Sequence, residues 1–155
     1  MYNKGQGVPQ DDRTAWKWYR LAAKQGFAQA QYNLGVSYYF GRGALLDYKT
    51  ALKFYTLAAK QGLAQAQYNL GQMYFKGRVI PQDYKTAVKW YRLAANQGNV
   101  DAQYSLGWMY ETGEGVPQND KTAVKWLKRA AEQAYADAQY NHKEMKSRLV
   151  SKGID

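Results

Sequence analysis

Apolar positions recur along this chain with the period of an α-helix. Starting at Ala15, apolar residues stand at positions i, i+3, i+4 and i+7, a stripe that Trp18, Tyr19 and Ala22 complete. This spacing is typical of a helix that buries one face and leaves the other polar. We therefore predict an amphipathic helix that begins after Asp11.

A second kind of segment carries small residues on its apolar face. Ala30, Leu34 and Tyr38 fall on one side of a predicted helix, and Gly35 beside them leaves room for another helix to approach closely. Start and stop signals bracket the first kind of segment. The residues suited to cap its N-terminus are Asp11, Asp47, Asp83 and Asn119, and the glycines suited to end it are Gly26, Gly62 and Gly98.

Both kinds of segment recur every 36 residues. The second kind, here termed helix A, contains AQAQYNLG at Ala28 and Ala64, VDAQYSLG at Val100 and ADAQYNHK at Ala136. The first kind, here termed helix B, contains DDRTAWKWYRLAAKQG at Asp11 and recurs three times at the same step. A glycine-rich loop such as GQGVPQD separates A from B. The unit is therefore helix A, loop, helix B and a tight turn.

One A–B hairpin cannot bury its apolar face alone, whereas stacked hairpins can. We therefore predict an all-α solenoid of about eight helices, formed as a single domain over residues 1–155. The predicted parts are an incomplete repeat lacking helix A at residues 1–26, full repeats at 27–62, 63–98 and 99–134, and a capping helix with its tail at 135–155.

The combined pattern resembles the Sel1-like repeat family. The matching elements are A-x-A-Q-x-x-L-G-x-x-Y, then G-x-G-V-P, then D-x-x-x-A-x-x-W-Y-x-x-A-A-x-Q-G, and they extend over residues 1–142. The resemblance implies a right-handed, tetratricopeptide-like α-α superhelix. The tetratricopeptide repeat itself fits less well, because its period is 34 residues and its A–B loop is shorter.

The last repeat departs from the pattern. Ala134 replaces the glycine that ends the other B helices, and His142 and Lys143 replace Leu-Gly. A more polar terminal helix is expected of a cap that exposes one face to water. As the only histidine, His142 is interpreted as a surface or capping residue.

The first residues, MYNKGQGVPQDD, align with the inside of a repeat and not with its start. We interpret this as a truncation that has removed the first helix A. Its partner helix should then expose Trp16, Trp18 and Tyr19, a surface suited to self-association.

Composition limits the class of protein. The chain has no cysteine and no apolar run long enough to span a membrane. No signal peptide is visible, so the sequence leaves the localisation unknown, although the resemblance suggests the bacterial periplasm or secretion.

Positive charge is concentrated in the first two-thirds of the chain. Residues 13–100 contain 13 Lys and Arg against two Asp, whereas residues 101–155 contain eight charges of each sign. On the B helices the cations form a predicted basic outer stripe: Arg13, Lys17, Arg20, Lys24, Lys49, Lys53, Lys85, Lys89 and Arg92. This favours an acidic partner, with a merely solvated helix face as the alternative. We expect no nucleic-acid binding, because stacking aromatics are not interleaved with the cations.

The far side of the A helices is the predicted partner-binding groove. Rotating 100° per residue from Leu34 brings aromatic and amide side chains together there. The predicted groove residues are Tyr32, Val36, Tyr39, Tyr68, Gln72, Phe75, Tyr104, Trp108 and Glu111. Position 36 varies through its successors Gln72 and Trp108, as expected where repeats individualise a binding surface. For the tyrosines, a structural role between repeats remains an equal alternative.

No constellation of catalytic residues is evident. A single histidine excludes a multi-histidine metal site, and the pair Glu111 and Glu114 is most simply a pair of solvated loop charges. The repeated G-x-G lacks the context of a dinucleotide site and marks a turn. We therefore predict no enzyme activity, no catalytic or metal site and no cofactor.

The predicted function is a protein-protein interaction or adaptor module that binds a protein or peptide partner. The resemblance implies roles at the bacterial envelope, in host interaction or in neutralising a toxin. It also implies an alternative, a cell-wall or β-lactam-directed activity suggested for cysteine-rich relatives, although this chain has neither the cysteines nor an S-x-x-K motif. An engineered or consensus-like scaffold is a third alternative, because the repeats are nearly identical.

Overall fold

The computed structural model describes residues 11–151, without the side chains of residues 135, 137–139 and 141–151. The predicted loop at residues 1–10 and the tail after Ser151 lie outside this range. The described residues form seven helices: α1 (Asp12–Lys24), α2 (Ala28–Phe40), α3 (Tyr48–Lys60), α4 (Ala64–Lys76), α5 (Tyr84–Asn96), α6 (Val100–Thr112) and α7 (Asp120–Ser151).

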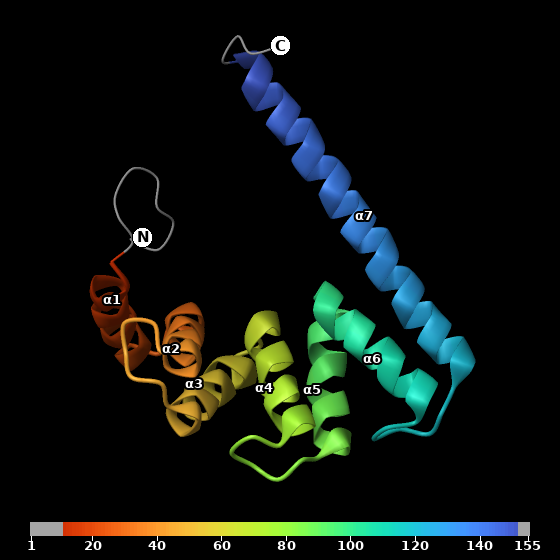
Figure 1. Cartoon of the computed structure of the whole chain (residues 1–155), viewed down its shortest axis with the longest axis horizontal. Coiled ribbons are helices and arrows are strands. Elements are labelled where there is room, and N and C mark those ends of the chain that lie inside the picture. The colour runs from red at the N-terminus through yellow and green to blue at the C-terminus, as the bar shows by residue number, and fades with distance from the viewer. Residues whose placement is uncertain (1–10, 152–155) are drawn as a thin grey trace.

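The helices form an open arc in chain order (Figure 1). Each helix packs mainly against the helices that precede and follow it in sequence. The A helices of the sequence pattern are α2, α4 and α6, and the B helices are α1, α3, α5 and the first part of α7. The predicted all-α solenoid is thus confirmed, and its stability rests on contacts between neighbours.

The predicted start signals are confirmed. At α3, the Asp47 carboxylate accepts hydrogen bonds from the backbone N–H groups of Lys49 (3.0 Å) and Thr50 (3.1 Å), and the Thr50 hydroxyl donates to it at 2.6 Å. These bonds favour the ionised form and hold the pKa of Asp47 below its ordinary value. Asp11, Asp83 and Asn119 cap their helices in the same way.

The predicted count of eight helices is wrong for the described residues, because the last B and A segments form one continuous helix. The other B helices end beside Gly26, Gly62 and Gly98, whose φ angles of 89°, 93° and 90° are unfavourable for residues with a side chain. Ala134 takes that place in the fourth repeat, so α7 runs on for 32 residues. The predicted capping segment is therefore its second half, and the His142 side chain lies outside the described residues.

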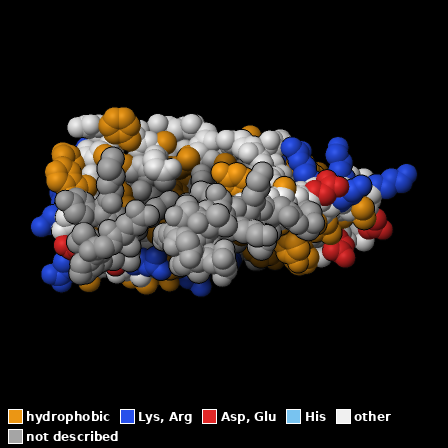
Figure 2. All heavy atoms as spheres, turned by 90° about the horizontal axis from the view of Figure 1, so that it is seen from above, with side chains coloured by type: hydrophobic (Ala, Val, Ile, Leu, Met, Phe, Trp, Pro, Cys, Tyr) orange, Lys and Arg blue, Asp and Glu red, His pale blue; other side chains and the backbone are white. Residues whose placement is uncertain are grey.

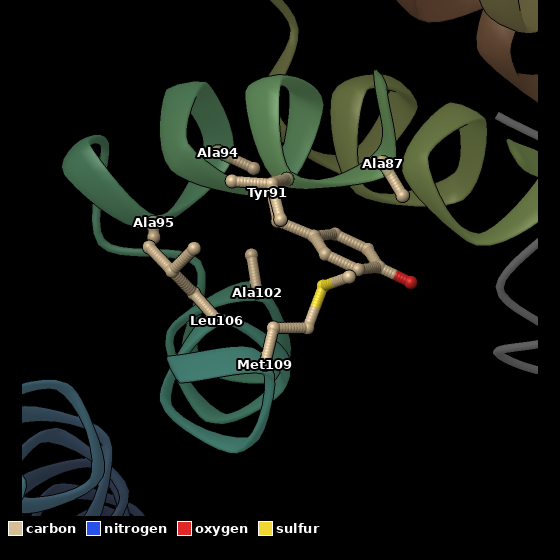
Figure 3. Packing of buried hydrophobic residues seen from close by; sticks show 8 residues of the cluster. Ala87, Tyr91, Ala94, Ala95, Ala102, Leu106 and Met109 are labelled. Atoms are coloured by element: carbon tan, nitrogen blue, oxygen red, sulfur yellow. The ribbon is translucent and has the colours of Figure 1, made fainter. Parts of the chain in front are cut away.

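The core is built from small residues on facing helices. In the cluster between α5 and α6, Ala87, Ala94 and Ala102 are fully buried, and Leu106 and Met109 pack against them. Figure 3 shows the Tyr91 ring extending from α5 toward Met109 of α6. Buried alanines allow close helix approach, and the larger side chains fill the remaining space.

Close approach also requires the glycine inside each A helix. A β-carbon at residue 71 would lie 2.7 Å from Cδ1 of Tyr91, a side chain that is 2% exposed. Gly35 faces Tyr55 in the same way one repeat earlier. The predicted function of Gly35, to admit a neighbouring helix, is therefore confirmed.

A ladder of glutamines joins successive hairpins. Gln67 at the start of α4 is 4% exposed, and its amide nitrogen donates to the Ala59 carbonyl at 3.3 Å. Its side-chain oxygen accepts from Gln97 Nε2 at 2.8 Å, and Gln97 also donates to the Gly62 carbonyl at 2.9 Å. One repeat earlier, Gln61 donates to the Gln31 side-chain oxygen at 2.7 Å; one repeat later the direction is reversed, and Gln103 donates to the Gln133 oxygen at 3.4 Å. The sequence analysis did not assign a role to these glutamines.

Replacing Gln67 with alanine should lower the free energy of unfolding by about 1–3 kcal/mol, because it removes the two side-chain hydrogen bonds to the Ala59 carbonyl and from Gln97, each worth about 0.5–1.5 kcal/mol. Urea unfolding followed by circular dichroism measures this change. The exposed Gln65 on the same helix provides a matched control, and its replacement should change stability by less than about 0.5 kcal/mol. Equal effects of the two substitutions would show that the ladder does not stabilise the fold.

The first described helix has an uncovered apolar face. Trp18 is 58% exposed, whereas its successors Phe54 and Trp90 pack against the core of the preceding repeat. The predicted exposure of Trp18 is confirmed, but that of Trp16 and Tyr19 is wrong, since both are half-buried against the cluster that includes α2. Helix α2 covers them even though no helix before α1 is described.

Candidate binding groove

A cavity of about 440 Å³ opens between α2 and α4, and we term it the cationic pocket. Its walls combine aromatic rings, two amides and two cations. The lining residues are Tyr39, Phe40, Leu46, Tyr48, Tyr55, Asn69, Gln72, Lys76 and Arg78. No carboxylate lines it among the residues that the structure describes.

The Arg78 side chain is held in place by aromatic rings. Its guanidinium donates to the Tyr48 hydroxyl at 3.0 Å and lies 5.3 Å from the centre of that ring and 5.9 Å from the centre of the Tyr39 ring. Such contacts orient a guanidinium without neutralising its charge. Arg78 therefore presents a positioned cation at the pocket wall.

A second cavity, of about 350 Å³, opens between α4 and α6, and we term it the Trp108 pocket. The lining residues are Gln72, Phe75, Lys76, Tyr91, Tyr104, Ser105, Trp108 and Met109. The rings of Phe75 and Trp108 meet edge to face, with their centres 5.7 Å apart. This pocket is predominantly apolar and suits an aromatic or aliphatic side chain.

Gln72 and Lys76 line both cavities, so the two pockets are neighbours on either side of α4, and we term the pair the A-helix groove. The predicted residues that line the two pockets all lie on the A helices α2, α4 and α6. The groove is a surface long enough for a segment of polypeptide to lie across more than one repeat.

The structure brings together five of the nine predicted groove residues. These five line the two pockets: Tyr39, Gln72, Phe75, Tyr104 and Trp108. Val36 instead lines a small cavity between α1 and α2, and the exposed Glu111 lines neither pocket of the groove. Whether any of the nine contacts a partner stays a prediction.

Tyr32 and Tyr68 have a packing role. Both are half-buried, with ring centres 5.9 Å from Tyr55 and 5.7 Å from Tyr91 respectively. Burial raises the pKa of Tyr32 and of Tyr68 above the ordinary value. Tyr104 in the next repeat is 62% exposed, and Leu127 stands where the earlier repeats have the core tyrosine.

The sequence analysis missed the pocket residues that are not on A helices. Arg78 comes from the A–B loop, and Tyr48, Tyr55 and Tyr91 come from B helices. A helical rotation cannot place a loop side chain. The sequence does contain one sign that points to this loop position. The residue there varies among repeats, and Glu114 occupies the position of Arg78 one repeat later.

The predicted basic outer stripe is exposed along its whole length. All nine cations, Arg13, Lys17, Arg20, Lys24, Lys49, Lys53, Lys85, Lys89 and Arg92, lie at the surface of the B helices. Arg20 lies 5.5 Å from the centre of the Trp16 ring, and Arg92 donates to the Tyr110 hydroxyl at 2.8 Å. In Figure 2, the end formed by α6 and α7 carries carboxylates together with Lys and Arg side chains.

The part of the chain that the structure describes offers neither a metal-binding cluster nor a membrane-spanning helix. Over residues 11–151 with described side chains, no three His, Asp or Glu side chains are grouped as a metal site would require. Within the same limits, no helix has both the length and the apolar character needed to cross a bilayer.

Comparison with known proteins identifies the repeat. The profile of the Sel1 repeat matches four consecutive segments, residues 1–27, 28–63, 64–99 and 100–135. The chain belongs to the Sel1 repeat family. This confirms the resemblance inferred from the sequence pattern. No curated protein sequence matches the chain significantly.

Solved Sel1 repeat structures resemble this one closely. A protective antigen present in uropathogenic Escherichia coli strains superposes with a TM-score of 0.81 at 37% identity, over 96% of this chain and 32% of that one. A Sel1 repeat protein from Oxalobacter formigenes gives 0.78 at 39% identity, over 94% and 42% respectively. This Sel1 repeat chain therefore spans less than half the length of either relative.

An immunity protein from Pseudomonas aeruginosa is also similar, with a TM-score of 0.59 at 25% identity, over 87% of this chain and 51% of that one. The relatives thus include an antigen and an immunity protein. They share the Sel1 repeat architecture of stacked helix pairs with this chain.

Proposed function

We propose that this Sel1 repeat chain is a non-catalytic interaction module that captures an extended segment of a protein partner in the A-helix groove. The proposal rests on two neighbouring pockets that share Gln72 and Lys76 of α4 and are lined by aromatic and amide side chains. Buried aromatic anchors supply most of the binding energy in protein interfaces.

The repeats differ where the groove is lined, which supports recognition of a particular partner. Trp108 occupies the position of Gln72 one repeat later, and both residues line the groove. The core positions next to them remain the same, as Leu70 and Leu106 illustrate. Variation on the groove with constancy in the core is how a repeat protein acquires specificity without losing its fold.

The exposed cations of the B helices would assist encounter with the partner. A basic surface accelerates association with an acidic protein and makes the association rate dependent on salt. In this proposal the groove determines which partner is bound, and the stripe raises the rate of association. The stripe lies on the B helices and does not line the groove.

An adaptor and a toxin-neutralising protein would use the same mechanism, because both act by covering a segment of another protein. The similarity to the immunity protein of Pseudomonas aeruginosa supports the second role. For either role, the partner remains to be identified by binding experiments.

Selection from a random-peptide display library on the immobilised full chain tests the proposal. Bound peptides should be released when soluble chain competes, but not when a chain with Tyr39→Ala and Trp108→Ala competes. A chain with Lys53→Ala and Lys89→Ala, changed only on the stripe, is the control and should compete like the unmodified chain. Equal competition by the groove variant and the unmodified chain would contradict the proposal.

A further inference from the structure

The two pockets of the groove are the same structural site one repeat apart. Moving along the chain by 36 residues converts lining residues of the cationic pocket into lining residues of the Trp108 pocket. The corresponding pairs are Tyr39 and Phe75, Tyr55 and Tyr91, Asn69 and Ser105, and Gln72 and Trp108. Differences between the pockets therefore report what each is adapted to bind.

The main difference is charge. Lys76 and Arg78 line the cationic pocket, and the residues at the corresponding positions one repeat later are Thr112 and Glu114. Lys76 also reaches the Trp108 pocket, but Arg78 does not. The pockets also differ at the position of Gln72, which is occupied by the Trp108 ring one repeat later.

The two cations have no carboxylate partner among the described residues, where the single ion pair joins Lys128 and Glu132. One hydrogen bond from Arg78 goes to a neutral hydroxyl, and a guanidinium carries five N–H donors. Its remaining donors match a carboxylate, which accepts two parallel hydrogen bonds from arginine. The cationic pocket thus presents oriented N–H donors that suit a carboxylate.

From this contrast we infer that the groove recognises an acidic peptide segment, with a carboxylate in the cationic pocket and an apolar side chain in the Trp108 pocket. The inference rests on the proposed function and specifies its ligand. The Gln72 side chain lines both pockets, and its amide nitrogen donates to the Tyr68 hydroxyl, which leaves the amide oxygen suited to accept a hydrogen bond from the backbone of the segment.

The fold also sets the distance between the two peptide residues that enter the pockets. The pockets lie on either side of α4, and a helix with its side chains is about 10 Å across. An extended chain advances about 3.3 Å per residue. The acidic and apolar residues of the bound segment should therefore be separated by about three positions.

The test uses peptides selected on the full chain and then synthesised with a fluorescent label. Fluorescence anisotropy gives the affinity of each peptide and of a variant with its acidic residue changed to the amide. That change should weaken binding to the unmodified chain by roughly three- to tenfold, as expected for a partly exposed charge pair. With Arg78→Gln, the preference for the acidic peptide should fall to the part that Lys76 supplies, and with Arg78→Gln and Lys76→Gln together the acid and amide peptides should bind equally.

Arg42→Gln is the matched control, because it removes the same charge from the equivalent loop position outside both pockets. It should retain the full preference for the acidic peptide. Peptides with a free or an amidated C-terminus distinguish a terminal carboxylate from a side-chain carboxylate as the anion. Circular dichroism of each variant verifies the helical fold.

Two results would overturn the inference, and they are distinguishable. If the peptides lose affinity for the Trp108→Ala chain but the acid-to-amide change has no effect, the inference is wrong and the proposed function stands. If no selected peptide loses affinity for that chain, the proposed function fails and the inference fails with it.

Discussion

Replacing Tyr91 with alanine is expected to lower the free energy of unfolding by about 3–5 kcal/mol, a large effect for a single substitution. The ring is 2% exposed and lies between α4, α5 and α6, where it contacts Gly71 and Met109 (Figure 3). Its removal leaves a cavity that rigid helices on three sides cannot fill. Because a solenoid is stabilised through neighbouring repeats, the loss should spread beyond α5.

Urea unfolding followed by circular dichroism measures the effect. Tyr104→Ala is the matched control, since that tyrosine is 62% exposed and its loss should change stability by less than about 0.5 kcal/mol. A cost below about 1 kcal/mol for Tyr91→Ala would show that the ring is not the centre of this core.

The contact between Tyr91 and Gly71 can be isolated by a double-mutant cycle. Gly71→Ala alone should destabilise the chain by about 1–3 kcal/mol, despite the higher helix propensity of alanine, because the new methyl group meets the Tyr91 ring. In the Tyr91→Ala background that cost should largely disappear. Additive costs would mean that the two residues do not determine the helix spacing together.

Replacing Trp108 with alanine should weaken the binding of groove peptides by about 30-fold, the largest functional effect. An aromatic anchor in an interface contributes about 2 kcal/mol or more, which corresponds to that factor. Trp108 is only half-buried and lies at the edge of the core, so the fold should survive its loss. Phe75 would lose its edge-to-face neighbour and the pocket would lose one wall.

Fluorescence anisotropy with a display-selected peptide measures this loss. Trp18→Ala is the matched control, because that tryptophan is 58% exposed on α1, outside the groove, and its removal should leave the affinity unchanged. A Trp108→Ala chain that is helical and binds as tightly as the unmodified chain would remove the apolar anchor from the mechanism.

The regular part of the fold was predictable because each helix signals its own limits. Asp47 and Gly62 act within one turn of the chain, and their effects do not depend on the rest of the molecule. The 36-residue step then predicts stacking. The helix count differs at Ala134, because this residue stands where the other B helices have a terminal glycine and α7 continues through it without interruption.

The groove was only partly predictable. Helical rotation found Gln72 and Trp108, since both belong to regular A helices. It could not find Arg78, because the position of a loop side chain depends on the rings of Tyr39 and Tyr48 that it packs against. Nor could it separate tyrosines that pack within the repeats from those at the surface, because the distinction depends on the residue facing each ring.

Binding of a partner in the A-helix groove can be followed at the five tryptophan indole N–H signals in a nitrogen-15 NMR spectrum. Trp108 is on the A helix α6, whereas the other four, Trp16, Trp18, Trp90 and Trp126, are on B helices. Single substitutions assign the signals, and a selected peptide is then added. We expect the Trp108 signal to shift on saturation while those of Trp18, Trp90 and Trp126 stay in place. A shift confined to the B-helix tryptophans, with Trp108 unchanged, would contradict the account.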